Sequence, residues 1–563
     1  MFKQVRRGFY TMTDDQRRHL IDRLSAEGFN NIDLGETTIG CDSIVEGHII
    51  KLRCTLSSIF PYELPTVYIE ENCYKNISPV PHVNSDFSIC TFDKSTVIPN
   101  FKFPVQVIIA SLLQAKSIIH QGILKENLED FYEEFNAYWH LECDGKAESI
   151  ISIPSKPCTI KCYFSRKEVY LADNKASLDQ YLSNINIKER YLNDYYDCIY
   201  LPLNINICPP FPKTNYDLYC LLKTDTANFR AYNKYLKAHI PQGAFVAFSI
   251  PYKGHRYMQL LMHTGISTNV NGFRKGHAPV GIAYLNDTKK SSPLMFDVED
   301  MSQERLFTRG GTGLTKTISR VAVIGCGSVG SYIVEALSEY GVASFVLVDN
   351  EKLSTENIAR HYCGYEYVNT SKVSAISNKL VKHNPNIKCD VYEENGHVFI
   401  NDHLNVLNTC DIIFVATASA PLEYRIVEMI NDLQICRPVV LTWVEPFLAA
   451  GQALILNKPQ NVFEELFDKN YIFTKRVITN SDNFLLKEAG CQSTFIPYAA
   501  FSLKRYIYAF LDYLIYGSIS KGKSGNYVFT WCGDIISARK KGCQIAPEWA
   551  EADNYSIHVK RID

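Results

Sequence analysis

Apolar residues recur first at the spacing of a helix and then at the spacing of strands. Residues 13–28 predict a helix, because Thr13 can cap it, Gln16 can reach back to that cap and Gly28 can end it. The apolar face of this helix is formed by Leu20, Ile21 and Leu24.

Two strand-like runs follow, HIIKLRCTL at residues 48–56 and TVYIE at 66–70, and a turn-rich segment, IFPYELP, separates them. After a long loop that carries Cys90, residues 104–121 return to helical spacing. One helix, a few antiparallel strands, a loop with a cysteine and further helices predict a compact α+β domain over residues 1–145.

The middle of the chain, residues 146–304, is rich in Tyr, Pro and Asn and contains strand-like stretches such as GAFVAFSIPY. Its composition predicts an α+β intermediate domain to which we assign no chemistry. The stretch NGFRKGHAP around Arg274 is interpreted as a surface loop, and the polar, Gly-rich residues 302–317 as a linker.

The last part, residues 305–563, opens with a buried strand, a glycine turn, an amphipathic helix and a second buried strand, RVAVIGCGSVGSYIVEALSEYGVASFVLVD. This order is a βαβ unit of a doubly wound parallel sheet. The runs CDIIFVAT and RPVVLTW add two more strands. The chain is therefore predicted to be multidomain, with two α+β domains followed by an α/β domain of Rossmann-like type.

Composition narrows the possible partners. The 563 residues carry a formal net charge of -2 and no strongly basic arm, which argues against direct binding to nucleic acid through its phosphates. No run reaches the roughly 18 uninterrupted apolar residues that a membrane span needs. We expect a cytoplasmic protein without a membrane partner, whose 18 cysteines are mostly free thiols.

The glycine turn is the first candidate site. Gly325, Gly327 and Gly330 fit G-x-G-x-x-G between a strand and a helix, where backbone amides can hold a phosphate. Asp349 closes the second strand, where a carboxylate can accept ribose hydroxyls. On these residues alone, a nicotinamide-dependent dehydrogenase is the default interpretation.

Three polar residues beyond Asp349 change that interpretation. Asn357, Arg360 and Lys372 follow it in the pattern D-x7-N-x2-R-x11-K. Two cations and an amide suit phosphoryl or adenylyl transfer, in which charge builds on the phosphates, whereas hydride transfer does not need them. The alternative is that Arg360 and Lys372 are solvated charges on a helix.

This constellation, over residues 320–456, resembles the adenylating fold of ubiquitin-activating enzymes and their bacterial ThiF-type relatives. The resemblance implies ATP with Mg²⁺ as cofactors and adenylation of a protein's C-terminal carboxylate. It places Gly325, Gly327, Gly330 and Asp349 around the nucleotide. Asn357, Arg360 and Lys372 would then bind the phosphates.

Two departures from the ThiF pattern concern metals. The aspartate that usually follows the strand DIIFVATAS corresponds here to Ala418. Either Asp349, Glu351 or Glu423 holds the magnesium ion, or the metal is handled differently. The paired C-x-x-C zinc site of many bacterial relatives is also missing, so packing alone must stabilise the C-terminal part.

A cysteine further along is a candidate acyl acceptor. Cys491 lies in KEAGCQSTF, between a glycine and a polar run, before Pro497 begins an expected helix. It resembles the thioester-forming cysteine of activating enzymes, and the alternative is a buried structural thiol. Cys532 and Cys543 are weaker rivals because they lack this small, polar context.

Cys90 taken alone would be a packed thiol, but residues 10–145 resemble a ubiquitin-conjugating domain. The resemblance rests on a turn with Pro61 and Pro65 and on His82 and Asn84 ahead of the cysteine. It implies that Cys90 carries an acyl thioester and that Asn84 stabilises the oxyanion. Here valine replaces the family's proline between His82 and Asn84, and the spacing from Asn84 to Cys90 is two residues shorter.

Together the domains resemble the fused conjugation enzyme of bacterial antiphage CBASS systems. The resemblance implies a modifier with a flexible C-terminus, a cGAS-like nucleotidyltransferase (CD-NTase), and an amine or protein lysine as acceptor. The acyl group would pass from AMP to Cys491, then to Cys90 and then to the amine. A homodimer is expected, with Arg309 of the linker as a candidate to reach the partner's nucleotide.

Three rival functions stay open at this point. The modifier could instead be a small ubiquitin-like β-grasp protein. The chain could be a ThiF-type activator of a sulfur carrier, for which Cys90 is dispensable. It could also be a non-catalytic scaffold whose Rossmann-like domain only binds nucleotide.

Overall fold

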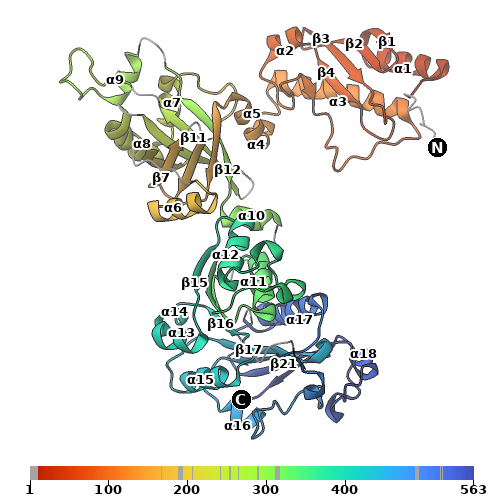
Figure 1. The fold of residues 1–563 in the computed structure, drawn as a ribbon. Helices are drawn as coiled ribbons and strands as arrows, with labels where there is room; N and C mark the ends of the chain where they lie inside the picture. The colour runs from red at the N-terminus through yellow and green to blue at the C-terminus, as the bar shows by residue number, and fades with distance from the viewer. Residues whose placement is uncertain are drawn as a thin grey trace. The chain divides into compact units, whose positions relative to one another are not determined.

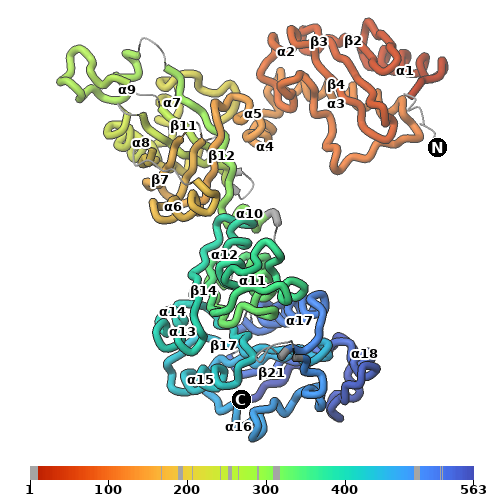
Figure 2. The backbone as a smooth tube through the Cα atoms, viewed as in Figure 1, coloured from red at the N-terminus to blue at the C-terminus, as the bar shows by residue number. Residues whose placement is uncertain are grey.

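The structure is a computed structural model, and its chain divides into two compact units (Figures 1 and 2). One unit contains residues 1–178 and 191–300, and the other contains residues 179–190 and 301–563. The described residues are 10–165, 168–187, 194–205, 207–240, 243–252, 255–263, 266–287, 291–310, 318–487, 494–519, 521–522 and 524–563.

The first unit opens with the predicted helix, α1 (Asp14–Ala26). Its capping box is formed as expected: the Gln16 amide donates to Thr13 Oγ1 (3.3 Å), and the Thr13 amide donates to the Gln16 side chain (3.0 Å). Leu20 and Leu24 of the predicted apolar face are fully buried, whereas Ile21 is 38% exposed and lies outside the core.

A five-stranded antiparallel sheet in sequence order follows α1. Its strands are β1 (Phe29–Leu34), β2 (Thr38–Val45), β3 (His48–Thr55), β4 (Thr66–Ile69) and β5 (Ser88–Ile89), with α2 (Glu71–Ile77) before β5. Helix α3 (Pro104–Leu124) packs across this sheet (Figure 1). Of the helices described, only α3 is long and apolar enough to cross a membrane, and half of that stretch is buried in the domain.

Two short helices, α4 (Asp130–Glu133) and α5 (Phe135–Glu142), lead from α3 to a closed seven-stranded barrel. The barrel order is β10-β11-β12-β6-β8-β7-β9, closed by parallel pairing of β9 with β10. Its strands are β6 (Gly145–Ser149), β7 (Cys158–Ser165), β8 (Glu168–Ala172), β9 (Tyr195–Pro202), β10 (Ala244–Tyr252), β11 (His255–His263) and β12 (Leu294–Asp300).

Helices accompany the barrel in the sequence: α6 (Lys175–Asn184), α7 (Asn215–Leu222), α8 (Thr226–His239) and α9 (Val280–Leu285). The stretch around Arg274 is an exposed loop, as expected, and Gly272 and Gly276 adopt positive φ there. The Gly276 amide donates to Asn269 Oδ1 (2.8 Å), so the loop is internally bonded.

Helix α5 is anchored in the barrel by Trp139, which is 2% exposed. The indole stacks on Phe135 (5.6 Å between ring centroids) and meets Phe211 and Phe248 edge-on (5.4 and 5.3 Å). Its Nε1–H donates to the Phe296 carbonyl (3.1 Å) on β12. The indole is therefore both enclosed by aromatic rings and hydrogen-bonded.

The second unit contains an eight-stranded sheet of order β15-β14-β13-β16-β17-β18-β21-β22. The first five strands in that order are parallel and the last three pairings are antiparallel. The strands are β13 (Arg320–Ile324), β14 (Ser344–Val348), β15 (Lys388–Tyr392), β16 (Ile412–Val415), β17 (Val439–Val444), β18 (Ala450–Leu456), β21 (Tyr527–Cys532) and β22 (Ile557–Arg561).

Helices cover this sheet, and α11 and α17 lie side by side on one face (Figure 2). The helices are α11 (Ser328–Tyr340), α12 (Lys372–His383), α13 (Gly396–Asp402), α14 (Leu404–Leu407), α15 (Ala420–Asn431), α16 (Val462–Leu466), α17 (Ala500–Asp512) and α18 (Ile535–Lys540). The predicted βαβ unit is β13-α11-β14. Alternate residues of β13 enter separate apolar clusters, Val321 and Val323 in one and Ala322 and Ile324 in the other.

The stretch interpreted as a linker contains a helix, α10 (Gln303–Gly310). Ser302 Oγ accepts the Arg305 amide (3.3 Å), which caps the first turn. The polar composition of this stretch concealed a helix that starts at a serine cap.

Trp139→Ala is expected to lower the free energy of unfolding of the first unit by about 3–5 kcal/mol, because it leaves a cavity among aromatic rings. Leu141→Ala, on the same helix at a residue 54% exposed, is the matched control and should change it by less than about 0.5 kcal/mol. Denaturant unfolding followed by far-UV circular dichroism measures the stability of both variants without relying on tryptophan fluorescence. Equal losses in the two variants would contradict the anchoring role of Trp139.

Candidate functional site

The predicted glycine turn connects β13 to α11, and two of its glycines are required by packing. A Cβ on Gly330 would lie 1.9 Å from the Gly325 carbonyl oxygen, and a Cβ on Gly325 would lie 2.9 Å from the Ala416 backbone. Gly325 also has φ +89°. A Cβ on Gly327 would meet nothing within 4 Å, so free space lies in front of the N-terminus of α11.

That free space belongs to a cavity of about 860 Å³. The cavity collects Gly327 from the turn together with Asn357, Arg360 and Lys372 from the crossover. Aromatic side chains line it as well, namely Trp443, Phe495 and Tyr498. The structure thus brings together four of the residues that the sequence analysis assigned to nucleotide binding.

The two predicted cations differ in their surroundings. Lys372 begins α12, is 5% exposed, and its Nζ forms an ion pair with the Glu351 carboxylate. Arg360 ends a 3-10 helix, and its guanidinium lies over the Phe495 ring, 5.2 Å from the centroid. Asn357 Oδ1 accepts hydrogen bonds from the Ser354 amide and hydroxyl (3.1 Å each). The side-chain oxygen of Asn357 is therefore used to cap the N-terminus of that helix.

Asp349 stabilises the glycine turn through hydrogen bonds to backbone amides. Its carboxylate accepts the Cys326 amide (2.8 Å) and the Glu351 amide (2.8 Å). Burial raises the pKa of Asp349, and the nearby Lys372 charge opposes that shift. Asp349 is not among the residues that line the cavity, so its predicted contact with a ribose stays a prediction.

His361 is a lining residue that the sequence analysis missed. Its Nδ1 accepts the Cys363 amide (3.0 Å), so the proton is on Nε2, which donates to the Cys326 carbonyl (2.9 Å). Burial lowers the pKa of His361 to about 4, which keeps the ring neutral. The available signal was its position directly after Arg360.

Only one of the three carboxylates considered as magnesium ligands lines the cavity. Glu351 does so with its side chain 66% exposed. Glu423 is 7% exposed, and burial raises its pKa to about 7. Within the described ranges, no group of three or more His, Cys, Asp or Glu could hold a metal ion. Mg²⁺ commonly binds one or two carboxylates plus substrate phosphates, a demand that Glu351 can meet.

Cys491 lies outside the described residues, and so does the side chain of Arg309. The segment that carries Cys491 is bracketed by β19 (Leu486–Lys487) and β20 (Thr494–Phe495), which pair with each other. Leu485 and Phe495, on either side of the undescribed residues, both line the cavity. The rivals Cys532 and Cys543 are buried.

In the first unit, Cys90 is an accessible thiol. Among the described cysteines, the exposed ones are Cys90, Cys220 and Cys436. Partial burial raises the pKa of Cys90, and the Glu134 charge shifts it in the same direction, with Lys94 opposing. The thiol is therefore reachable but is held mostly protonated near neutral pH.

The loop before Cys90 folds back as a tight hairpin. The Cys90 amide donates to the His82 carbonyl (2.8 Å), and the Asn84 amide donates to the Ser88 carbonyl (2.9 Å). The Asn84 side chain donates to Ser88 Oγ (2.9 Å), which occupies one of its amide hydrogens. The shortened spacing between Asn84 and Cys90 is accommodated by this hairpin.

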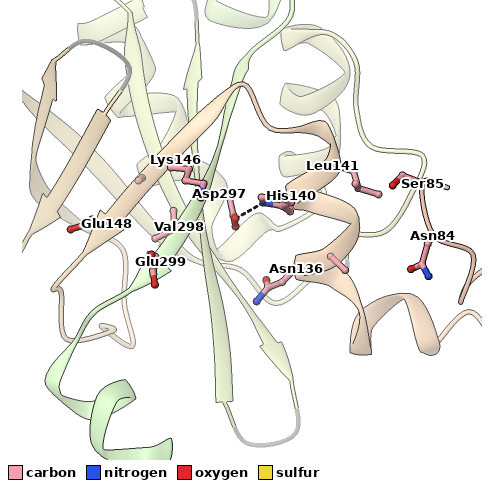
Figure 3. Close-up of a pocket in the computed structure, with 12 residues that line it drawn as sticks. Asn84, Ser85, Asn136, His140, Leu141, Lys146, Glu148, Asp297, Val298 and Glu299 are labelled. Carbon is pink, nitrogen blue, oxygen red and sulfur yellow. Dashed lines mark hydrogen bonds and ion pairs between the residues drawn. The ribbon is translucent and has the colours of Figure 1, made fainter. Parts of the chain in front are cut away.

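Asn84 also borders a cavity of about 610 Å³ between the hairpin and the start of the barrel (Figure 3). Figure 3 shows His140 of α5 bonded to Asp297 of β12, through Nδ1 and Oδ2 at 2.7 Å. Lys146 and Glu299 line the same cavity, so both charge signs are present there.

His82 itself lies between two carboxylates. Its Nδ1 is 2.8 Å from Glu134 Oε1, and its Nε2 is 3.0 Å from Asp130 Oδ2. The Glu134 hydrogen bond raises the pKa of His82, with further contributions from the Glu134 and Asp130 charges, while burial opposes the shift. This arrangement favours the imidazolium.

Two protein families match this chain, one over each of the regions that contain the candidate sites. Residues 306–485 match the ThiF family, and residues 20–147 match the family described as Prokaryotic E2 family B. The chain is 22% identical over 458 residues to the ATP-dependent ubiquitin transferase-like protein Cap2 of Pseudomonas aeruginosa, covering 78% of this chain and 80% of that protein.

Other known proteins are similar to a smaller part of this chain. The ubiquitin-like modifier-activating enzyme 5 of Caenorhabditis briggsae is 27% identical over 124 residues, or 20% of this chain and 29% of that protein. The crystal structure of E. coli MccB aligns with a TM-score of 0.27 and 17% identity, covering 43% of this chain and 62% of that chain.

Gly330→Ala is expected to destabilise the second unit by about 2–3 kcal/mol, because the new Cβ forces the turn and α11 apart. Gly327→Ala is the matched control, since its Cβ enters free space, and it should change stability by less than about 0.5 kcal/mol. Thermal unfolding measures both, and similar losses would contradict the packing argument.

Replacing His82 by Asn, which tolerates positive φ, removes the imidazolium and should cost about 2 kcal/mol of stability near pH 6. The pKa of His82 is raised above its ordinary 6.5. The stabilisation is therefore complete below about pH 6.5 and is lost as pH rises through the folded-state value. Denaturant unfolding should show the difference between wild type and variant narrowing towards about pH 9. A difference that widens with pH would contradict the charged state.

Proposed function

Because the chain carries a prokaryotic E2 family B domain and a ThiF-family domain, we propose that it activates a protein modifier with ATP and conjugates it to an amine. It is an ATP-dependent, ubiquitin-transferase-like enzyme. The observation that supports the adenylation step most directly is the convergence of Gly327, Arg360 and Lys372 on one cavity.

In the first step, the C-terminal carboxylate of the modifier attacks the α-phosphate of ATP, and pyrophosphate leaves. The N-terminus of α11 accepts a phosphate at Gly327, because backbone amides and free space coincide there. Arg360 and Lys372 neutralise the charge that grows on the phosphates. Lys372 can do so only by exchanging its Glu351 partner for a phosphate, or by sharing itself between them.

Glu351 is the residue that would hold a magnesium ion beside those phosphates, where the ion would neutralise further negative charge. Without ATP, Glu351 neutralises Lys372. The same carboxylate thus has a partner both before and after the nucleotide binds.

In the next steps, the acyl group passes between thiols. The Cys491 thiolate attacks the acyl adenylate and AMP leaves; the Cys90 thiolate then attacks the Cys491 thioester, and the Cys491 thiolate leaves. An amine finally attacks the Cys90 thioester, forms an amide and releases the thiol. Asn84 would donate to the oxyanion with the amide hydrogen that Ser88 does not occupy.

For the modifier we propose a CD-NTase, and for the setting a cytoplasmic antiphage system. The similarity to Cap2 over 78% of the chain supports this choice. A small β-grasp protein is the second candidate, supported by the similarity to a ubiquitin-like modifier-activating enzyme. We also propose that the ThiF-family domains pair as a homodimer, with Arg309 directed to the partner's nucleotide.

The relay is tested with Cys90→Ala and Cys491→Ala variants, each incubated with ATP, Mg²⁺ and either a CD-NTase or a β-grasp protein. Non-reducing gels should show a thiol-sensitive adduct on Cys491 when Cys90 is replaced, and none on Cys90 when Cys491 is replaced. Cys436→Ala, which removes another exposed thiol, is the control and should leave both adducts unchanged.

Each other outcome identifies an alternative. Charging of Cys90 without Cys491 would disprove the two-thiol order. Activity that does not need Cys90 would favour sulfur-carrier activation. The absence of any adduct with either protein would favour a nucleotide-binding scaffold.

A further inference from the structure

Every polar group of His82 is engaged. Its imidazole nitrogens contact Glu134 (2.8 Å) and Asp130 (3.0 Å), and its amide donates to the Tyr138 hydroxyl (2.8 Å). Its carbonyl accepts the amide of Cys90 (2.8 Å). His82 therefore stands between the predicted nucleophile and the helices α4 and α5.

His82 has φ +63°, a left-handed conformation that residues other than glycine seldom adopt. Such a conformation persists where surrounding contacts hold it. Here those contacts come from residues about fifty positions away in the sequence: Asp130, Glu134 and Tyr138. The Tyr138 hydroxyl also donates to Glu134 Oε2 (3.0 Å), which orients that carboxylate.

Helix α5, which supplies Tyr138 and directly follows Glu134, is itself fixed at two points. Trp139 is enclosed by aromatic rings and bonded to the Phe296 carbonyl, and His140 is bonded to Asp297 (Figure 3). A continuous series of contacts therefore runs from strand β12 through α5 and His82 to the backbone of Cys90.

We propose that Asp130 and Glu134 are positioning residues for acyl transfer at Cys90, holding the nucleophile's backbone through His82. This proposal rests on the proposed thioester at Cys90. Neither carboxylate takes part in bond making: the acyl carbon forms its new bond to the attacking amine nitrogen, and the Cys90 sulfur leaves.

Glu134 has two effects on Cys90 that oppose each other, and this makes the proposal testable. It positions the backbone of Cys90 through His82, whereas its charge disfavours the Cys90 thiolate. The titratable groups around Cys90 are Glu134, Asp93 and Lys94, and those around His82 are Glu134, Asp130 and Tyr138. The charge of Glu134 raises the pKa of Cys90, so its removal makes the thiolate easier to form. A residue that acted only through this charge would slow thiolate chemistry, and its removal would speed every reaction of the thiol.

The decisive variants are Glu134→Gln and Asp130→Asn in the full chain, with Glu129→Gln as a control. Glu129 is an exposed neighbour of Asp130. Two rates are measured: alkylation of Cys90 by iodoacetamide, followed by peptide mass spectrometry, and discharge of a preformed Cys90 thioester to free lysine. Thermal unfolding of each variant shows whether the fold is kept.

For Glu134→Gln we expect alkylation near pH 7.5 to rise about threefold, because loss of the carboxylate charge lowers the pKa of Cys90 and increases the thiolate fraction. Discharge should fall about tenfold, because the thioester is no longer held in place. Asp130→Asn should slow discharge with little change in alkylation. The ratio of wild-type to Asp130→Asn discharge should shrink as pH rises, because His82 then loses its proton in the wild type too.

Discharge that stays unchanged or speeds up in both variants would overturn the proposal, as would a loss that Glu129→Gln shares. If the wild type forms no thioester at Cys90, the proposed function fails. The alkylation rates then decide separately whether Glu134 acts on Cys90: an unchanged rate in Glu134→Gln overturns the contact and an increased rate supports it.

Discussion

The chemistry of the second unit depends on one close approach between two backbone segments. Gly330 lies so near the Gly325 carbonyl that no side chain fits between them, and this contact sets the start of α11 at the end of β13. The loop that carries the cations is bound to the same turn: Ser328 donates to the Arg360 carbonyl, and His361 donates to the Cys326 carbonyl. The backbone amides at the start of α11 and Arg360 are therefore placed by one local structure.

Each of the two candidate sites contains a cationic side chain that is paired with carboxylates. Lys372 is buried against Glu351, and His82 lies between Asp130 and Glu134. The first pair opens towards a cavity, where phosphate oxygens can compete for the ammonium. The second arrangement consists of His82 and two carboxylates, and it joins separate segments of the chain. One arrangement suits a charge that must change partners during the reaction, and the other suits a charge that must stay where it is.

Local features were predictable from the sequence, and long-range ones were not. The capped helix α1 and the βαβ unit depend on neighbouring residues, so their spacing identified them. Closure of the barrel requires β9 to pair with β10 and β12 with β6, across up to about 150 positions, and no local pattern encodes that. The contacts of His82 with Asp130 and Glu134 were missed for the same reason. Asp349 was identified by its place after a strand, yet in the structure it bonds the turn's own backbone.

The closed barrel has a consequence for the strand edges that the first unit presents to other proteins. An open sheet presents unpaired amides and carbonyls at its edge strands, where a second chain can add a strand. In the described part of the barrel each strand has a neighbour on both sides. Under the proposed function, a modifier tethered to Cys90 would therefore find no strand there to extend, and the barrel that supports α5 is protected against edge-to-edge aggregation.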